Sequence, residues 1–181
     1  MEKIIKSSDI KTKELIEIVL EGKIFIYPTD TIYGIGCNAL DKKAVEKIKE
    51  IKKRDKDKPL SVIAPSIDWI KKSCFVDVDL NKYLPGPYTL ILKKKNAEFL
   101  KQVSSLKTLG IRIPDCKFTK QIQKSGVPFI TTSVNLSGEP QIKKISEIPK
   151  EILEKVDVVV DAGELNGRAS TLITNGKEIR R

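Results

Sequence analysis

The residue types best suited to chemistry in this chain are gathered at residues 27–37. This stretch holds several hydroxyl groups, one carboxylate (Asp30) and two glycines. It follows a short apolar run at residues 24–26, which is typical of a strand, and it precedes a predicted helix that begins near Asp41. We therefore predict a strand-to-helix connection, which is where α/β proteins place their ligands. The alternative is a polar hairpin that only reverses the chain.

A cationic segment follows at the end of that predicted helix. It contains Lys52, Arg54 and Lys58, and Pro59 then begins extended chain. Side chains at alternating positions of an extended segment point the same way, so Lys52 and Arg54 are predicted to converge on one anion. The alternative is a charged helix end, because cations also suit the negative end of the helix dipole. Since only five arginines occur, we expect Arg54 and Arg112 where a planar two-donor group is needed.

Two further segments carry hydroxyl and amide groups. Residues 131–138 contain Ser133 and Asn135 directly after a predicted strand, and Ser170 opens the last predicted strand. Asn135 could hydrogen-bond a phosphate or a ribose, while Ser133 could meet a small ligand. Serine and threonine are also common in turns, where they bond to local backbone groups, so each segment alone indicates little.

Several kinds of site are excluded by what the sequence lacks. It has no histidine, which rules out serine–histidine–aspartate triads, cysteine–histidine pairs and histidine-ligated metals. It also has no Walker-type loop and no Gly-x-Gly-x-x-Gly, so side-chain cations and a less common loop would have to hold any phosphate. Cys37, Cys74 and Cys116 form no Cys-x-x-Cys pair and are predicted to be free thiols without a metal. The net charge of +10 favours polyanionic partners, such as a nucleotide or an RNA.

Short apolar runs alternate with helical patterns along the chain. This alternation predicts an α/β fold with a twisted, mixed β-sheet flanked by helices, mixed because some connections are too short for crossovers. We expect a single domain over residues 1–181, since the sequence shows no repeat or linker. Helices are expected at residues 12–21 (ended by Gly22), 41–53 (capped by Asp41), around Trp69, and at 115–124. Strands are expected at residues 23–27, 60–64, 88–92, 110–113, 128–132, 157–161 and 171–174.

The composition is that of an ordinary soluble protein, with 40% hydrophobic and 32% charged residues. No apolar run approaches the ~20 residues that a membrane span needs. The first residues lack the apolar core and the cleavage site of a signal peptide. A cytoplasmic protein without membrane contact is therefore expected.

The motifs occur in the same order and context in one enzyme family. The chain resembles the YrdC-like threonylcarbamoyl-AMP synthases over nearly its whole length. The family's Pro-Thr-Asp-Thr loop matches residues 28–31, and its Arg-x-Pro strand end matches residues 112–114. Its Asp-Gly-Gly…Ser-Thr stretch resembles residues 161–171. The family's polar centre, a Lys-x-Arg pair and a Ser-x-Asn pair, matches Lys52, Arg54, Ser133 and Asn135.

The sequence departs from the family pattern in places. Ala162 replaces one glycine, and Ile63 stands where longer relatives carry a histidine near the threonine. Arg180 falls within or just after the family's closing strand.

The resemblance also implies which residues bind which substrate. The residues expected to contact L-threonine are Thr31, Arg112, Ser133 and Ser170. Those expected to contact ATP are Lys52, Arg54, Lys58, Thr108, Asn135 and Arg180. The catalytic centre implied by the two motif pairs consists of Lys52, Arg54, Ser133 and Asn135.

The activity implied is the formation of threonylcarbamoyl-adenylate and pyrophosphate from L-threonine, bicarbonate and ATP, for the threonylcarbamoyladenosine modification of tRNA. Mg²⁺ would be held mainly by the ATP phosphates and water, and downstream threonylcarbamoyl-transferase proteins would use the product. Weak tRNA or double-stranded RNA binding would be compatible with this enzyme. The competing hypothesis is a non-catalytic double-stranded RNA- or tRNA-binding module. The basic charge supports that module, whereas the aromatic content of only 6% argues against it.

Overall fold

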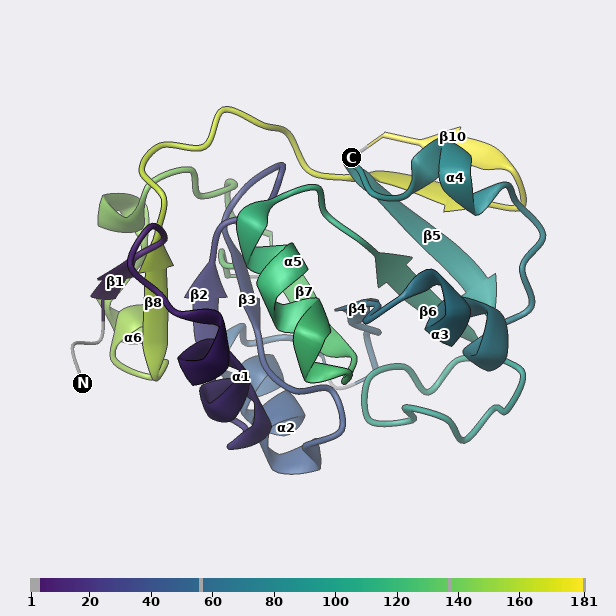
Figure 1. The fold of residues 1–181 in the computed structure, drawn as a ribbon, viewed down its shortest axis with the longest axis horizontal. Coiled ribbons are helices and arrows are strands. Elements are labelled where there is room, and N and C mark those ends of the chain that lie inside the picture. Colours follow the sequence, from purple (N-terminus) through teal and green to yellow (C-terminus); the bar gives the residue numbers. More distant parts are fainter. Residues whose placement is uncertain (1–3, 56, 137, 181) are drawn as a thin grey trace.

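The computed structural model describes residues 4–55, 57–136 and 138–180, which fold into a sheet with helices on both faces (Figure 1). The strands are β1 (Ile4–Lys6), β2 (Phe25–Tyr27), β3 (Gly34–Gly36), β4 (Ser61–Ile63), β5 (Tyr88–Lys93), β6 (Thr108–Arg112), β7 (Phe129–Ser133), β8 (Val158–Asp161), β9 (Thr171–Thr174) and β10 (Lys177–Ile179). The helices are α1 (Thr12–Leu20), α2 (Lys42–Ile51), α3 (Ile67–Ser73), α4 (Leu80–Tyr83), α5 (Lys117–Ile122) and α6 (Lys150–Leu153), with 3-10 helices η1 (Gln123–Ser125) and η2 (Ile145–Glu147). None of the helices in this part of the chain has the length and apolar character of a membrane-spanning segment.

The ten strands of the described chain form one mixed sheet in the order β1-β8-β2-β3-β7-β4-β6-β5-β9-β10. Pairing is parallel for β1–β8, β8–β2, β4–β6 and β5–β9, and antiparallel for the other neighbours. The sheet is twisted, since β8 and β5 run in clearly different directions (Figure 1). The predicted fold class, α/β with a mixed sheet flanked by helices, is therefore confirmed.

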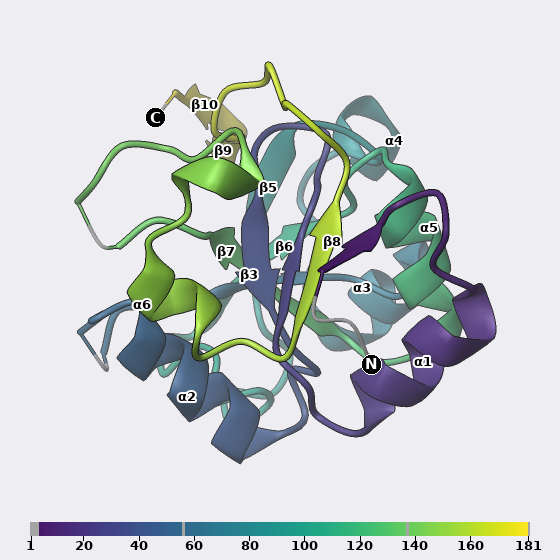
Figure 2. The same ribbon diagram turned by 90° about the vertical axis from the view of Figure 1, so that its left-hand side faces the viewer.

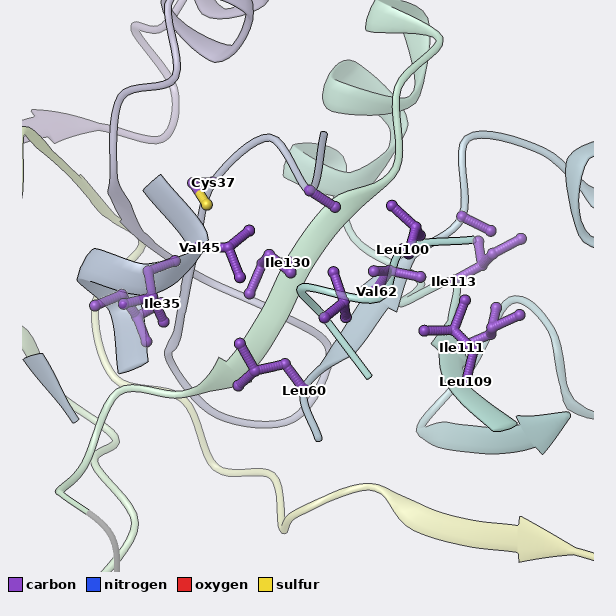
Figure 3. Close-up of a cluster of buried hydrophobic side chains, with 14 of the residues drawn as sticks. Ile35, Cys37, Val45, Leu60, Val62, Leu100, Leu109, Ile111, Ile113 and Ile130 are labelled. Carbon is purple, nitrogen blue, oxygen red and sulfur yellow. The ribbon is translucent and has the colours of Figure 1, made fainter. Parts of the chain in front are cut away.

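Helices cover both faces of the sheet and give it two cores. Helices α1 and α5 lie on one side and α2 and α6 on the other (Figure 2). The core under α1 and α5 is aromatic: Tyr27 stacks on Phe118 with 4.6 Å between ring centroids, and Phe129 meets both rings edge-on. The larger core, on the other face, is aliphatic and includes Val62 and Ile130 (Figure 3).

Local sequence marks the end of α1 and the start of α2, as predicted. The Asp41 side chain accepts a hydrogen bond from Ala44 N at 3.1 Å and caps α2. Gly22 follows α1 with φ +74°, a conformation that glycine adopts at little cost. Helix α5 is shorter than the predicted 115–124, because its last turn tightens into η1 before Gly126.

The stretch at residues 27–37 is a correction to the sequence prediction. It is a β-hairpin, because Gly34–Gly36 forms β3 and pairs antiparallel with β2. A lone apolar residue, Ile35, between two glycines gives no strand pattern, but the glycines allow close packing. A Cβ atom at Gly36 would lie 2.0 Å from Ile130 O. The elements that the sequence analysis did not predict are β1, β3, α4, η2, α6 and β10.

Candidate active site

A cavity of about 430 Å³ opens on the sheet face opposite the larger core. The alternation of side chains along the strands explains its position. In β5, Leu90 and Leu92 enter the larger core, while Thr89 and Ile91 line the cavity. The neighbouring strand β6 alternates in the same way. The volume lies in the range of small-molecule sites.

The floor of the cavity consists of small side chains held in register. Ser61 of β4 lies between Thr131 of β7 and Gly110 of β6, and Gly110 pairs with Ile91 of β5. A Cβ atom at Gly110 would lie 2.3 Å from Ser61 Oγ. Glycine therefore lets these strands approach without filling the space above them.

The loop between β2 and β3 forms one wall and is organised by Thr29. Its hydroxyl accepts hydrogen bonds from the backbone N–H groups of Thr31 (3.1 Å) and Ile32 (3.2 Å). It also donates to Ile32 O at 2.7 Å. The Thr29 and Thr31 hydroxyl oxygens lie 2.8 Å apart and form a further hydrogen bond. The Thr31 side chain is thus fixed at the cavity wall.

Arg112 reaches the same wall from the end of β6. Its Nη2 forms a buried ion pair with Asp30 at 2.9 Å and lies 3.4 Å from Thr31 Oγ1. The other oxygen of Asp30 accepts the backbone N–H of Asp115 at 3.0 Å. Burial lowers the pKa of Arg112 and the charge of Asp30 opposes this, so the guanidinium stays charged. Its Nε is buried and has no hydrogen-bond partner within the described ranges.

The segment from residue 162 to Ser170 crosses over the β2–β3 loop and closes this end of the cavity. A Cβ atom at Gly167 would lie 2.2 Å from Thr31 O, so the two backbones are in direct contact. The Tyr33 hydroxyl anchors the start of the segment by accepting from Ala162 N (2.9 Å) and donating to Gly163 O (2.8 Å). At its end, Ser170 Oγ lies 2.6 Å from Thr89 Oγ1.

The opposite end of the cavity carries Arg54 and Asn135. Arg54 donates from Nη2 to Pro59 O at 2.7 Å and from Nε to Lys58 O at 3.3 Å, and burial lowers its pKa. Asn135 donates from Nδ2 to Glu139 O at 2.5 Å. The Asn135 Oδ1 is a buried acceptor for which the described residues supply no donor.

Lys52 does not lie where the sequence predicted. Its side chain is only 2% exposed, and its Nζ donates to Asn135 O at 2.6 Å and also to Ser133 O. Lys52 still has helical backbone angles and Lys53 turns left-handed with φ +47°, so the segment up to Arg54 is not extended. The extended geometry on which the predicted convergence of Lys52 and Arg54 rested is therefore absent, although the charge of Arg54 lies near the Lys52 ammonium. Burial, with the nearby charges of Arg54 and Lys58, lowers the pKa of Lys52 to about 7.

Of the ten residues predicted to bind substrates, seven line this cavity: Thr31, Arg54, Thr108, Arg112, Ser133, Asn135 and Ser170. The other three, Lys52, Lys58 and Arg180, do not line it. Lys58 and Arg180 are exposed to solvent. Ser137, within the predicted segment 131–138, lies outside the described residues.

The cavity also has polar residues outside the segments that the sequence analysis singled out, among them Ser61, Thr89, Ser104, Glu139 and Gln141. Thr89 gave a usable signal, because it is a polar residue directly before the apolar run Leu90–Leu92. Ser61 and Ser104 gave none, since isolated serines are frequent on any surface.

The chemistry of the cavity is that of charged and hydroxyl side chains. The described residues contain no group of three or more histidine, cysteine or carboxylate side chains that could hold a metal ion. Cys37, Cys74 and Cys116 are free thiols, as predicted. Two arginines at opposite ends of a hydroxyl-lined cavity can bind a ligand that carries two separate anionic groups.

Comparison with known sequences matches most of this chain to one protein family. A family model named Sua5_yciO_yrdC, described as "Telomere recombination", matches residues 17–181. A protein of Methanocaldococcus jannaschii named putative threonylcarbamoyl-AMP synthase is 41% identical over 181 residues, which cover 94% of this chain and 85% of that protein.

Several solved structures have the same fold, among them the following two. The crystal structure of Pyrococcus abyssi Sua5 complexed with L-threonine has a TM-score of 0.82 and 29% identity, covering 94% of this chain and 53% of that chain. The crystal structure of Escherichia coli YciO has a TM-score of 0.81 and 26% identity, covering 98% of this chain and 92% of that chain.

Proposed function

Because the chain belongs to the Sua5/YciO/YrdC family, we propose that it is an L-threonylcarbamoyladenylate synthase of the cytoplasm. It would make threonylcarbamoyl-AMP and pyrophosphate from L-threonine, bicarbonate and ATP, for threonylcarbamoyladenosine in tRNA. The relative from M. jannaschii, at 41% identity, supports this activity through its name. The relative YciO of E. coli is named an uncharacterized protein, so the family alone does not decide the reaction.

The observation that carries the proposal is the convergence of residues from distant segments on one cavity. Thr31, Arg112 and Ser170 meet at one end, and Arg54, Thr108 and Asn135 line the same cavity. Sequence motifs that are weak one by one therefore share a single space of small-molecule size.

We propose that threonine binds beside Arg112. Asp30 engages Nη2 of Arg112, and a guanidinium has five N–H donors, so a second carboxylate can be bound. The hydroxyls of Thr31 and Ser170 would bond the amine or the hydroxyl of threonine. The threonine bound to P. abyssi Sua5 supports an amino-acid ligand in this family.

The proposed reaction needs little acid–base chemistry. The neutral threonine amine adds to CO₂ and releases one proton to water, or combines with bicarbonate and loses water, to give a carbamate. A carbamate oxygen attacks the α-phosphorus of ATP, and pyrophosphate leaves with the electrons of the broken P–O bond. Since the carbamate oxygen is already nucleophilic, the step depends on alignment and charge neutralisation. A chain without histidine can provide both.

Arg54 is proposed to neutralise part of the triphosphate charge, with Thr108 and Asn135 orienting the nucleotide. Lys52 is proposed to act indirectly, because its ammonium bonds to the backbone carbonyls of Ser133 and Asn135. Lys58 and Arg180 would approach the phosphates from the exposed rim. Mg²⁺ would arrive with ATP and be held mainly by phosphates and water.

The test is pyrophosphate release by the purified protein with each substrate omitted in turn. Release is expected to require threonine, bicarbonate and ATP together. Arg54→Ala should lower the rate at least about tenfold, which corresponds to ~1.4 kcal/mol of lost transition-state stabilisation. Lys53→Ala is the matched control, since this neighbouring cation is exposed and paired with Glu151.

Two outcomes would contradict the proposal. Pyrophosphate release that does not depend on threonine would exclude this synthase reaction. Tight, salt-sensitive RNA binding without turnover would favour the RNA-binding module instead, for which the net charge of +10 is the supporting observation. Weak tRNA binding beside turnover would be compatible with the enzyme and with delivery of its product to downstream transferase proteins.

A further inference from the structure

A buried lysine outside the cavity organises one of its walls. Lys94 follows β5 and is only 3% exposed. Its Nζ donates to three backbone carbonyls, those of Ala97 (2.7 Å), Phe99 (3.0 Å) and Ser104 (3.0 Å). An ammonium has three N–H donors, so each of them has an acceptor in this loop.

These bonds hold the loop at residues 95–106, which runs from the end of β5 to the start of β6 (Figure 1). The two ends of the loop meet, because Lys94 N donates to Lys107 O at 2.8 Å. Leu100 and Val103 anchor the loop in the larger core. Carbonyls of a buried loop need partners, and the Lys94 ammonium supplies them at the centre of this one.

The loop in turn shapes the cavity. Ser104 and Leu106 line it, together with Thr108 just after the loop. Ser104 Oγ donates to Thr108 O at 2.7 Å. The bond from Leu60 N to Val103 O, at 2.9 Å, attaches the loop to the chain beside Pro59.

The peptide group that joins Pro59 to Leu60 also contacts Arg54, the arginine proposed to bind phosphate. Pro59 O accepts the 2.7 Å hydrogen bond from Arg54 Nη2. The Lys94 ammonium is therefore connected to Arg54 in three steps. It bonds to Ser104 O, the preceding residue Val103 bonds to Leu60 N, and the carbonyl of Pro59 in the same peptide group bonds to Arg54. The Arg112 end of the cavity lies at the far ends of β5 and β6, where Arg112 and Ser170 contact Asp30 and Thr89 rather than the loop at residues 95–106.

We infer that Lys94 is a positioning residue for the nucleotide end of the cavity. The inference rests on the proposed function, in which ATP lies beside Arg54 and Thr108. Lys94 touches no substrate. It fixes the loop that places Ser104 and Thr108 opposite Arg54, and it leaves the threonine end unaffected.

The test compares ATP and threonine binding to the purified protein by titration calorimetry. Lys94→Met keeps the aliphatic stem and removes all three donors. The dissociation constant for ATP with Mg²⁺ should rise about tenfold, or ~1.4 kcal/mol, while that for L-threonine should change less than about twofold. Lys101→Met is the control, because Lys101 lies in the same loop but is exposed and paired with Glu98.

Equal weakening of both ligands, or no change in ATP binding, would overturn the inference and leave Lys94 a purely structural residue. If Lys94→Met does not fold, Lys94→Gln retains two N–H donors and should show a smaller loss of ATP binding, again with less than about a twofold change for L-threonine. A wild-type protein that binds no ATP would overturn the proposed function together with this inference. Wild-type ATP binding with unchanged binding in the variants would overturn the inference alone.

Discussion

Replacing Lys52 by methionine should remove a pH dependence of stability that the wild-type chain has. Methionine keeps the buried stem and roughly the same volume but carries no ammonium. In the wild type that ammonium is buried between the carbonyls of Ser133 and Asn135, near the charges of Arg54 and Lys58. Its pKa is therefore lowered from 10.5 to about 7 in the folded state.

The sign and size of the effect follow from proton linkage. Between pH 7 and pH 10.5 the unfolded chain holds a proton on Lys52 that the folded chain has largely released. Stability therefore rises with pH across this window, by about 1.4 kcal/mol per pH unit where the difference is one whole proton. Because the folded state is half-protonated at pH 7, the gain from pH 7 to pH 9 is about 2 kcal/mol. Below pH 7 both states are protonated and this contribution is flat.

The assay is urea unfolding at pH 7, 8 and 9, with the free energy of unfolding compared between wild type and Lys52→Met. The wild type should gain about 2 kcal/mol over the variant across this range, at an unchanged denaturant slope. Lys53→Met, which removes an exposed neighbouring ammonium, should follow the wild type. Parallel pH profiles for wild type and Lys52→Met would refute the reasoning, because the Lys52 ammonium would then have an ordinary pKa.

Two further predictions concern the threonine end of the cavity. Arg112→Lys should raise the KM for threonine far more than the KM for ATP, because one ammonium cannot serve both Asp30 and a substrate carboxylate in two-donor geometry; equal changes in both KM values would instead assign Arg112 to a structural ion pair. Gly167→Ala should lower stability by about 1–3 kcal/mol and raise the KM for threonine, because the added methyl group would lie 2.2 Å from Thr31 O. Thermal unfolding and steady-state kinetics check this, with Arg168→Ala as the neighbouring control, and an unchanged melting temperature would contradict it.

Features that depend on helix capping or on the regular spacing of apolar residues could be predicted from the sequence. Asp41 was predicted to cap α2 and does so. The apolar face of α2 and the strands β5 and β9 could be read from spacing, because helices and strands impose periods of 3.6 and 2. Strand β3 could not be predicted in this way, since its sequence Gly34-Ile35-Gly36 has one apolar residue and depends on contacts with β2 and β7.

The residues of the candidate site could be predicted only in part, and their geometry could not be predicted. The order of the motifs identified Thr31, Arg112 and Ser170, which lie far apart in the sequence and line one cavity. The burial of Lys52 and Lys94 could not be predicted, because both bond to backbone carbonyls. Every residue type has a backbone carbonyl, so a carbonyl partner cannot be recognised from the sequence. A lysine-rich chain also contains many lysines that could be the buried one.

The cavity is lined by residues from Thr29 to Leu172, and its Ser170 side is held by the parallel pairing of β9 with β5. This pairing joins Tyr88 to Thr171, which are separated by nearly half of the chain, so it requires closure of a long loop during folding. Partly folded forms that lack the pairing have no complete binding site. A ligand of the cavity should therefore protect the whole molecule against unfolding, by RT ln(1 + [L]/Kd), rather than protecting one region alone. Amide hydrogens of β1, at the far edge of the sheet, should exchange more slowly in its presence if they exchange only through global unfolding.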